Sequence, residues 1–467
     1  QLTCPFLFEL KTITYFSIMR DKHSHSAVAR IRDTTQLLID IFHLEGKMYI
    51  HPLKVYGRYS NTMFLPHVDT GNALDPVFQS RYAANLSKAH RKPLHTESSS
   101  NDPWESIYQK LNQYRNLSPE IIEGTPEVHA LKPELLKMII GTQPKFIELA
   151  SKYLSLDDLL SIRERIVGAG RIGGKAVGML LARYILVKEK TETLFSQILD
   201  SHDSFFIGSD VFFSFLVNND LFRLRLKLAK STHITKEEFA KVEERFLAGN
   251  FPESIIEQFK DVLDYFGQAP IIVRSSSLLE DNFGNAFAGK YRSEFCVNQG
   301  SPEERLAAFI KSVKLVYASS LNPDAISYRI KRGLGQDDEL MAILVQRVAG
   351  TPYKNYFFPI LAGVAFSQNL YAWTNRIDPK KGIIRLVFGL GTRAVDRVGG
   401  DYPRMIAVSN PELRPEDNTK ISMYSQKEVD VIDLKSNSLI EIPFHELIKD
   451  LDYQNLHLLV SMIKDRY

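Results

Sequence analysis

Cysteine is almost absent from this sequence, with only Cys4 and Cys296 among 467 residues. Two distant cysteines exclude a disulfide framework and a cysteine-rich zinc site, and they favour reduced thiols in a cytoplasmic protein. The sequence also lacks a run of about eighteen apolar residues, so we expect no membrane-spanning helix and no membrane partner. Its start has no basic stretch followed by an apolar core, which argues against a signal peptide. Because Gln1 stands in place of Met, we expect a cut piece or a processed product.

An excess of charge of one sign is missing as well. Lys and Arg number 58 and Asp and Glu number 55, which gives a net charge of +3. This balance is not typical of a nucleic-acid-binding protein, so we expect no nucleic-acid partner. With 44% hydrophobic and 24% charged residues, the composition is that of a globular protein, and the length predicts two or three domains.

The hydrophobic pattern changes between helix-like and strand-like stretches, which favours an α/β or α+β class with strands buried between helices. Helices are predicted over residues 33–44, 104–165, 176–186 and 194–258, and from Ser301 onward, where a Ser-Pro-Glu-Glu sequence has the form of a helix start. We expect the second of these to be broken at Pro119, Pro126, Pro133 and Pro144. Strands are predicted within residues 47–64 and over 270–274, 291–297, 340–348, 363–367, 382–388 and, last, 404–408, and a polar linker is predicted over 86–103.

Gly168, Gly170 and Gly173 form a G-x-G-x-x-G pattern, which in dinucleotide-binding folds follows a buried strand and opens a helix. The apolar pair next to it, Ile166 and Val167, is too short to predict a buried strand. No second strand ending in an acidic residue follows at the required distance. An NAD-dependent oxidoreductase is therefore a minor alternative.

Gly173, Gly174 and Lys175 open the helix predicted over residues 176–186. Bare glycine backbone at a helix start can approach a phosphate, and a lysine adds a mobile positive charge. A glycine turn beside a surface lysine fits the same residues equally well, so this motif alone does not decide.

Arg274 ends an apolar strand and is followed by Ser275 and Ser276. An arginine at the end of a buried strand lies where ligands bind in α/β sheets, and its planar fork suits phosphate oxygens, to which serine hydroxyls can also donate. In the alternative, Arg274 pairs with Glu280 or Asp281 and a serine caps the next helix.

Gln346, Arg347 and Val348 end another predicted strand. A strand that ends in polar residues can present backbone donors and acceptors to the edge of an adenine. An interior strand that runs into a loop would give the same sequence.

In this order, the segments resemble the ATP-binding domain of the phosphoenolpyruvate synthase and pyruvate, phosphate dikinase family, an ATP-grasp fold of two lobes. The stretch GGKAVGMLLA is similar to the GGKxxxL opening of that family, and VRSSSLLEDNFGNAFAGKY is similar to its VRSSAxxED…SFAGQ segment. LVQRVAG, AGVAFSQN and GLG followed by DYP come in the family's order, so the similarity covers about residues 165–410. We expect a mixed region over 1–100, a helical segment over 101–165, a first ATP-grasp lobe over 166–345 and a truncated second lobe over 346–467.

The resemblance implies that Lys175 and Arg274 hold the ATP phosphates as catalytic residues, with Ser275, Ser276 and the Gly173–Gly174 turn assisting. Gln346 and the backbone of Arg347 and Val348 would line the adenine side. ATP and Mg²⁺ are the implied cofactors. The implied reaction passes a phosphoryl or pyrophosphoryl group from ATP to a histidine and on to pyruvate or another acceptor, with the phosphohistidine and acceptor-binding domains outside this chain.

The sequence departs from the family pattern at two positions, where Lys290 replaces the Gln after FAG and Thr392 replaces the Glu after GLG. No DIEW…QxRP-like segment occurs before Tyr467, so we expect the carboxylates that hold Mg²⁺ to lie beyond it and this fragment alone to be inactive. These departures favour, as the main alternative, a nucleotide-binding sensor or scaffold without turnover.

Overall fold

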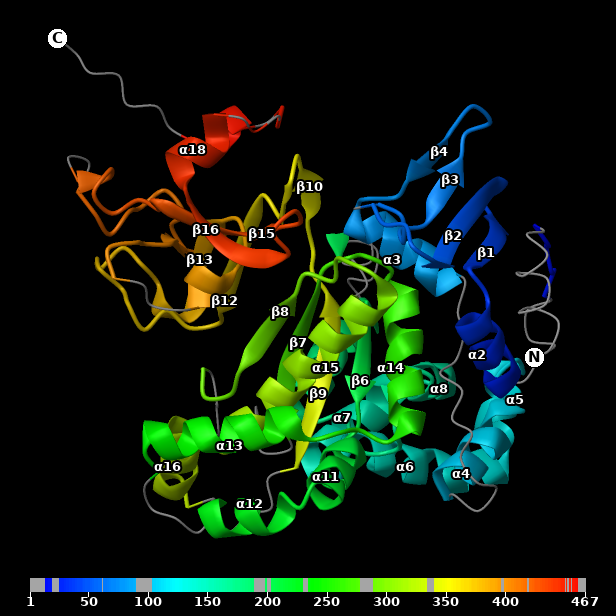
Figure 1. The fold of residues 1–467 in the computed structure, drawn as a ribbon. Helices are drawn as coiled ribbons and strands as arrows, with labels where there is room; N and C mark the ends of the chain where they lie inside the picture. The colour runs from blue at the N-terminus through cyan, green and yellow to red at the C-terminus, as the bar shows by residue number, and fades with distance from the viewer. Residues whose placement is uncertain are drawn as a thin grey trace. The chain divides into compact units, whose positions relative to one another are not determined.

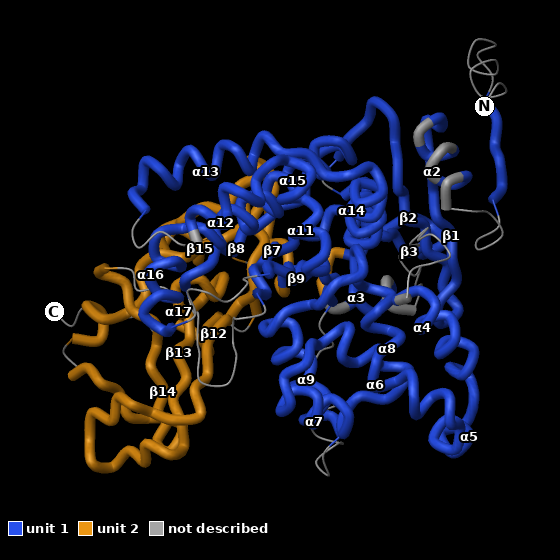
Figure 2. Tube along the Cα trace, turned by 90° about the horizontal axis from the view of Figure 1, so that it is seen from below, with its two compact units in different colours: residues 1–77, 81–348 blue, residues 78–80, 349–467 orange. Residues whose placement is uncertain are grey.

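The chain divides into two compact units. In the computed structural model, the first consists of residues 1–77 and 81–348 and the second of residues 78–80 and 349–467 (Figure 2). The first unit therefore runs across the borders expected after residues 100 and 165, and the division after Val348 lies close to the border expected after residue 345. The structure describes residues 13–18, 25–60, 62–89, 103–188, 198–199, 203–229, 234–277, 289–333, 340–395, 399–417, 420–449, 451, 453–454 and 456–460.

A five-stranded sheet forms the centre of the first unit (Figure 1). Its order is β5 (Ile166–Val167), β6 (Ser204–Ile207), β9 (Met341–Arg347), β7 (Ile271–Ser277) and β8 (Ser293–Cys296). The first two strands are parallel and the other neighbours are antiparallel. The sequence predicted β7, β8 and β9, but it placed β6 inside a helical stretch and excluded β5 as too short.

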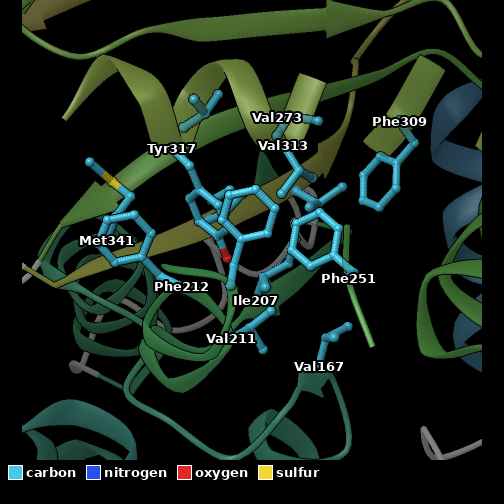
Figure 3. Close-up of a cluster of buried hydrophobic side chains, with 14 of the residues drawn as sticks. Val167, Ile207, Val211, Phe212, Phe251, Val273, Phe309, Val313, Tyr317 and Met341 are labelled. Atoms are coloured by element: carbon cyan, nitrogen blue, oxygen red, sulfur yellow. The ribbon is translucent and has the colours of Figure 1, made fainter. Parts of the chain in front are cut away.

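The sheet separates two hydrophobic cores, because side chains along each strand alternate between its faces. Ile343 and Val345 of β9 are buried in one core, and Leu344 between them is buried in the other. Figure 3 shows the first core, where Phe212 and Tyr317 pack with ring centroids 4.8 Å apart. Helices α11 (Ser209–Asn218), α13 (Lys236–Ala248), α14 (Glu253–Phe266) and α15 (Pro302–Ser319) line the first core, and α6 (Pro126–Ile140), α7 (Pro144–Tyr153), α8 (Leu156–Arg163) and α9 (Gly174–Lys188) line the second.

The Ser301 cap and three of the four prolines stand at helix ends, as the sequence predicted. Ser301 caps α15 in a reciprocal capping box with Glu304, as its sequence predicted. The prolines at 119, 126 and 144 each begin a helix, but Pro133 lies inside α6, so the predicted break there was wrong. The helix continues because the residues after Pro133, among them Leu135 and Ile139, are fully buried and hold it in place. The other described helices of this part of the chain are α2 (His25–Thr34), α3 (Ser80–Ala89), α4 (Pro103–Asn112), α5 (Pro119–Gly124), α12 (Phe222–Ala229) and α16 (Pro323–Lys331).

An antiparallel sheet near the N-terminus replaces the helix predicted over residues 33–44. Its strands are β1 (Leu37–Leu44), β2 (Lys47–Val55), β3 (His67–Asp69) and β4 (Leu74–Pro76). Between β1 and β2, Glu45 and Gly46 both have positive φ, which is the geometry of a tight hairpin turn. The hairpin pairs the whole of β1, so strand pairing prevailed over the helical spacing of its apolar residues. The predicted linker over 86–103 lies mostly outside the described residues.

The second unit contains two antiparallel sheets. One consists of β12 (Leu361–Phe366), β13 (Ile383–Phe388) and β14 (Arg404–Ala407), all three of which were predicted. The other is made of β10 (Thr351–Tyr353), β11 (Tyr356–Phe358), β15 (Glu428–Asp433) and β16 (Ser438–Pro443), which were not. The expectation that the last strand ends near residue 408 was therefore wrong. Along β15, apolar residues alternate with polar ones, and its Val429 and Val431 are fully buried. This alternation is the strand signal that sequence reasoning missed. The described residues of the unit also form the short helices η1 (Pro379–Lys381), α17 (Thr392–Val395), α18 (Phe444–Lys449) and η3 (Leu456–Leu458).

Candidate functional site

The start of α9 is fixed directly to strand β7. Gly173 has a φ of +80°, and a Cβ atom there would lie 1.5 Å from the carbonyl oxygen of Ser276. The Ser276 hydroxyl donates to the carbonyl of Ile172 (2.8 Å) and accepts from the amide of Ala176 (3.0 Å). Ser276 thus satisfies one of the amides that a helix start leaves without an intrahelical partner. Only glycine fits at position 173, and the helix start is held against the sheet.

This docking brings Lys175 to the second half of β7. Lys175 Nζ donates a hydrogen bond to Ser275 Oγ at 3.2 Å. Ser275 is fully buried, whereas Lys175 is partly exposed in the first turn of α9. A lysine ammonium therefore lies beside the residue that immediately follows Arg274.

Arg274 is connected to the same helix through the neighbouring strand. Its Nη1 donates to Gln346 Oε1 at 3.3 Å, and Gln346 Nε2 contacts Met179 Sδ at 3.1 Å and Ser204 Oγ at 3.3 Å. Met179 lies one helical turn after Lys175 on α9. Arg274 and Gln346 therefore lie on the face of the sheet that α9 covers, and Lys175 of that helix bonds to the residue next to Arg274.

Arg347 lies on the opposite face, because neighbouring residues of a strand alternate. Its Nε forms an ion pair with Asp203 Oδ2 at 2.7 Å, and Arg165 contacts the other carboxylate oxygen at 3.2 Å. Burial alone would raise the pKa of Asp203, but the two guanidinium groups outweigh it and hold that pKa below its usual range. The amide of Arg347 donates to the carbonyl of Asp203 and that of Val348 to Pro270, so neither backbone donor is left for an adenine.

Comparison with known proteins bears on these residues. A family model described as the AMP/ATP-binding domain of pyruvate phosphate dikinase matches residues 169–467. The chain belongs to this family. Its fold is accordingly ATP-grasp-like, as the resemblance implied. A stretch of 125 residues is 30% identical to a probable phosphoenolpyruvate synthase of Archaeoglobus fulgidus, covering 27% of this chain and 14% of that relative.

The G-x-G-x-x-G pattern is not accounted for by membership in the dikinase family. In the structure, this segment binds a side chain of the protein itself. Ile166 and Val167 do form a short buried strand, so the argument from its length was wrong. However, the amides of Ala169 and Gly170 donate to the two carboxylate oxygens of Asp210 at 3.0 and 2.7 Å. A protein carboxylate therefore occupies the donors that a pyrophosphate would need, which removes the geometric basis for a dinucleotide site.

The positions that depart from the dikinase pattern have partners of their own. Lys290 lies over the ring of Tyr328, 5.7 Å from its centroid. Thr392 Oγ1 donates to Asp430 Oδ2 at 2.5 Å, next to Arg393. Arg393 is buried and forms ion pairs with three carboxylates, those of Asp430, Asp401 and Glu441. Glu280 and Asp281, the alternative partners of Arg274, lie outside the described residues.

Sequence reasoning missed the residues that support this site. Asp203 and Asp210 lie outside every motif, and each acts on residues distant in the sequence, such as Arg347 and Gly170. Asp210 stands in the first turn of α11, where acidic residues are common, so its sequence position gave no distinctive signal.

The part of the chain that the structure describes has neither a metal-binding cluster nor a membrane-spanning helix. No group of three or more His, Cys, Asp or Glu residues there could hold a metal ion. No described helix combines the length and apolar character needed to cross a bilayer.

Proposed function

We propose that this chain is the ATP-binding part of a dikinase-type phosphotransferase. In this proposal, a phosphoryl or pyrophosphoryl group passes from ATP to a histidine of another domain and then to pyruvate or another acceptor. The observation that carries the ATP site is the hydrogen bond from Lys175 to Ser275, beside Arg274, within a family described as AMP/ATP-binding. Since the curated match spans only 14% of that relative's length, the histidine and the acceptor rest on the resemblance.

Two cations of different kinds would meet the phosphates. Lys175 supplies a compact, mobile charge at a helix start, where the helix dipole also favours anions. Arg274 supplies a planar fork, and its bond to Gln346 restricts the orientations of that fork. Phosphoryl transfer is accelerated mainly by positioning and by neutralising charge on the phosphate oxygens, which is the work these two side chains would do. In this proposal Gln346 is a positioning residue.

Magnesium stays part of the proposal without an assigned site. Mg²⁺ is usually held by one or two carboxylates together with the substrate phosphates. The described residues include no cluster of acidic or histidine side chains suited to a metal, so they do not identify its ligands. We assign no step to the ion.

Isothermal titration of the full chain with ATP tests the site. Lys175→Met and Arg274→Met should each weaken ATP binding by about tenfold or more, because charge-assisted hydrogen bonds contribute about 1.5–3 kcal/mol. Lys241→Met, which removes an exposed lysine of α13, is the matched control and should bind ATP as the parent chain does. Unchanged affinity in both site variants would refute the proposal.

A nucleotide-binding sensor without turnover is the second candidate. Its support is Thr392, which stands where the family usually has Glu and is bonded to Asp430. Incubation of the full-length protein with ATP labelled at the β or γ phosphate distinguishes the two. Label on the protein together with release of AMP supports the phosphotransferase, and ATP binding without either product supports the sensor.

The proposed location is the cytoplasm, where thiols stay reduced. Cys296 is a free thiol, and burial raises its pKa to about 11, so it is a weak nucleophile. Cell fractionation with an antibody to this chain tests the location directly.

A further inference from the structure

A cavity of about 830 Å³ lies within the second unit, on one face of the β12–β13–β14 sheet. Strand register places Phe366 opposite Ile383 and Arg385 opposite Met405, and all four side chains line the cavity. The volume is in the range of small-molecule sites, which are usually apolar with a few polar groups that fix the ligand.

Arg385 is an unusual residue for this sheet face. Its neighbours across the strands, Val364 and Met405, are both apolar. Within the described ranges, no carboxylate forms an ion pair with its guanidinium, although the side chain is partly buried. An arginine that lines a cavity and forms no ion pair with the described carboxylates is available to an anionic ligand.

Asn369 gives a second, independent indication of a ligand. It lines the same cavity, is only 1% exposed, and its Oδ1 accepts from the amide of Tyr371 at 2.9 Å. Its Nδ2 has no hydrogen-bond partner among the described residues. A buried donor left without an acceptor costs free energy, which an acceptor placed next to it would recover.

Aromatic rings provide the apolar part of the lining. Tyr371 is 73% exposed, and Tyr402 and Tyr424 pack edge to face with centroids 5.1 Å apart. Three acidic residues, Asp401, Glu416 and Asp417, and a second cation, Lys420, also line the cavity. Asp401 pairs with Arg393, and Glu416 lies 3.6 Å from Arg404. The lining thus includes Arg385 and Asn369, a cationic and an amide donor, together with ring faces on which a flat group can stack.

We propose that this cavity binds a small organic anion, a phosphate or carboxylate group joined to a flat ring. Arg385 and Asn369 would receive the anionic oxygens, and the ring would lie against the tyrosines. The site consists of second-unit residues alone, whereas the proposed ATP-phosphate residues, Lys175 and Arg274, belong to the first. The proposal therefore does not depend on ATP binding.

Ligand-observed NMR titrations of the full chain test the proposal, with Lys175→Met and Arg274→Met combined to remove the proposed phosphate site. The probes are phenyl phosphate, benzoate, phenol and inorganic phosphate. We expect phenyl phosphate or benzoate to bind at least about tenfold more tightly than phenol and inorganic phosphate, and the stronger of the two identifies the anionic group.

Two variants locate the binding. Arg385→Met should weaken it by about tenfold or more, and Tyr371→Ala, at a side chain too exposed to be needed for folding, should weaken it measurably. Lys435→Met, at an exposed lysine of the turn between β15 and β16, is the control and should have no effect. Binding of equal strength in the parent, Arg385→Met and Tyr371→Ala chains, or no binding of any probe, would overturn the proposal.

Discussion

Lys175 Nζ and Ser275 Oγ lie 3.2 Å apart, so the first turn of α9 and the second half of β7 are joined by a hydrogen bond between residues 100 positions apart in the sequence. The hydroxyl is buried and fixed by its strand, whereas the lysine is long and partly exposed. Ser275 therefore restricts where the ammonium group can lie. This relationship connects the glycine motif with the arginine motif and underlies the proposed phosphate site.

Ser275→Ala should lower ATP affinity less than removal of the lysine does. The variant keeps the positive charge but frees the Lys175 side chain, so we expect a loss of a few-fold, on the order of 1 kcal/mol. Isothermal titration with ATP measures it, and Ser254→Ala, at an exposed position of α14, is the control. An affinity equal to that of the parent chain would mean that the bond to Ser275 does not position the lysine.

Gly173→Ala should destabilise the first unit strongly and weaken ATP binding as well. The new methyl group would meet the Ser276 carbonyl oxygen at 1.5 Å, and φ of +80° is unfavourable for alanine, so we expect a loss of about 3 kcal/mol or more. Gly178→Ala in the same helix has no atom within 4 Å of its methyl group and should stabilise the chain by about 0.5–1 kcal/mol. Urea unfolding followed by circular dichroism measures both. Equal stabilities for the two variants would contradict the close approach at Gly173.

Most of what could be predicted from this sequence came from local motifs. Arg274, which was expected to end its strand, is instead the fourth residue of β7, which continues to Ser277. The Ser301 cap depends on side chains three residues apart, and the Gly173–Lys175 motif marks the start of α9. Their interpretation therefore required no knowledge of distant contacts. The helix predicted over 33–44 failed because its apolar residues also fit strand pairing, and the pairing with β2 decided the outcome.

The rest of the site depends on contacts that no local pattern reports. Asp203 and Arg347 are 144 positions apart, so their ion pair becomes visible only when β6 and β9 are placed side by side. The opposite directions of Gln346 and Arg347 could have been predicted, because alternation along a strand sends neighbours to opposite faces. That rule separates a residue that contacts Arg274 from one that supports the core.

Asp203→Asn should destabilise the first unit by about 3–5 kcal/mol, because it leaves the buried guanidinium groups of Arg347 and Arg165 without their anion. The amide can still accept hydrogen bonds, so the loss reports the charge rather than the shape of the side chain. Urea unfolding of the full chain measures the change. Glu244→Gln, at an exposed position of α13, is the control and should lie within about 0.5 kcal/mol of the parent chain. A similarly small effect for Asp203→Asn would show that the network contributes little to stability.

His51 should make the stability of the chain depend on pH. The ring is buried and its Nε2 donates to the carbonyl oxygen of Phe64 at 3.2 Å. Burial, together with the nearby positive charges of Arg305 and Arg347, lowers the pKa of His51 to about 3 in the folded chain. The unfolded chain binds the proton at the ordinary pKa of about 6.5, so the free energy of unfolding falls as the pH falls from about 6.5 to 3.

His51→Gln should remove this dependence while keeping a hydrogen-bond donor for Phe64. Between pH 7 and pH 4.5, the contribution of His51 amounts to about 2–3 kcal/mol, so the free energy of unfolding should change less in the variant than in the parent chain. Urea unfolding at the two pH values gives the difference for each protein. His445→Gln, at an exposed position of α18, should leave the difference as it is in the parent. If His51→Gln also leaves it unchanged, the histidine is not kept neutral by burial, because a group that takes up its proton equally in both states cannot make stability depend on pH.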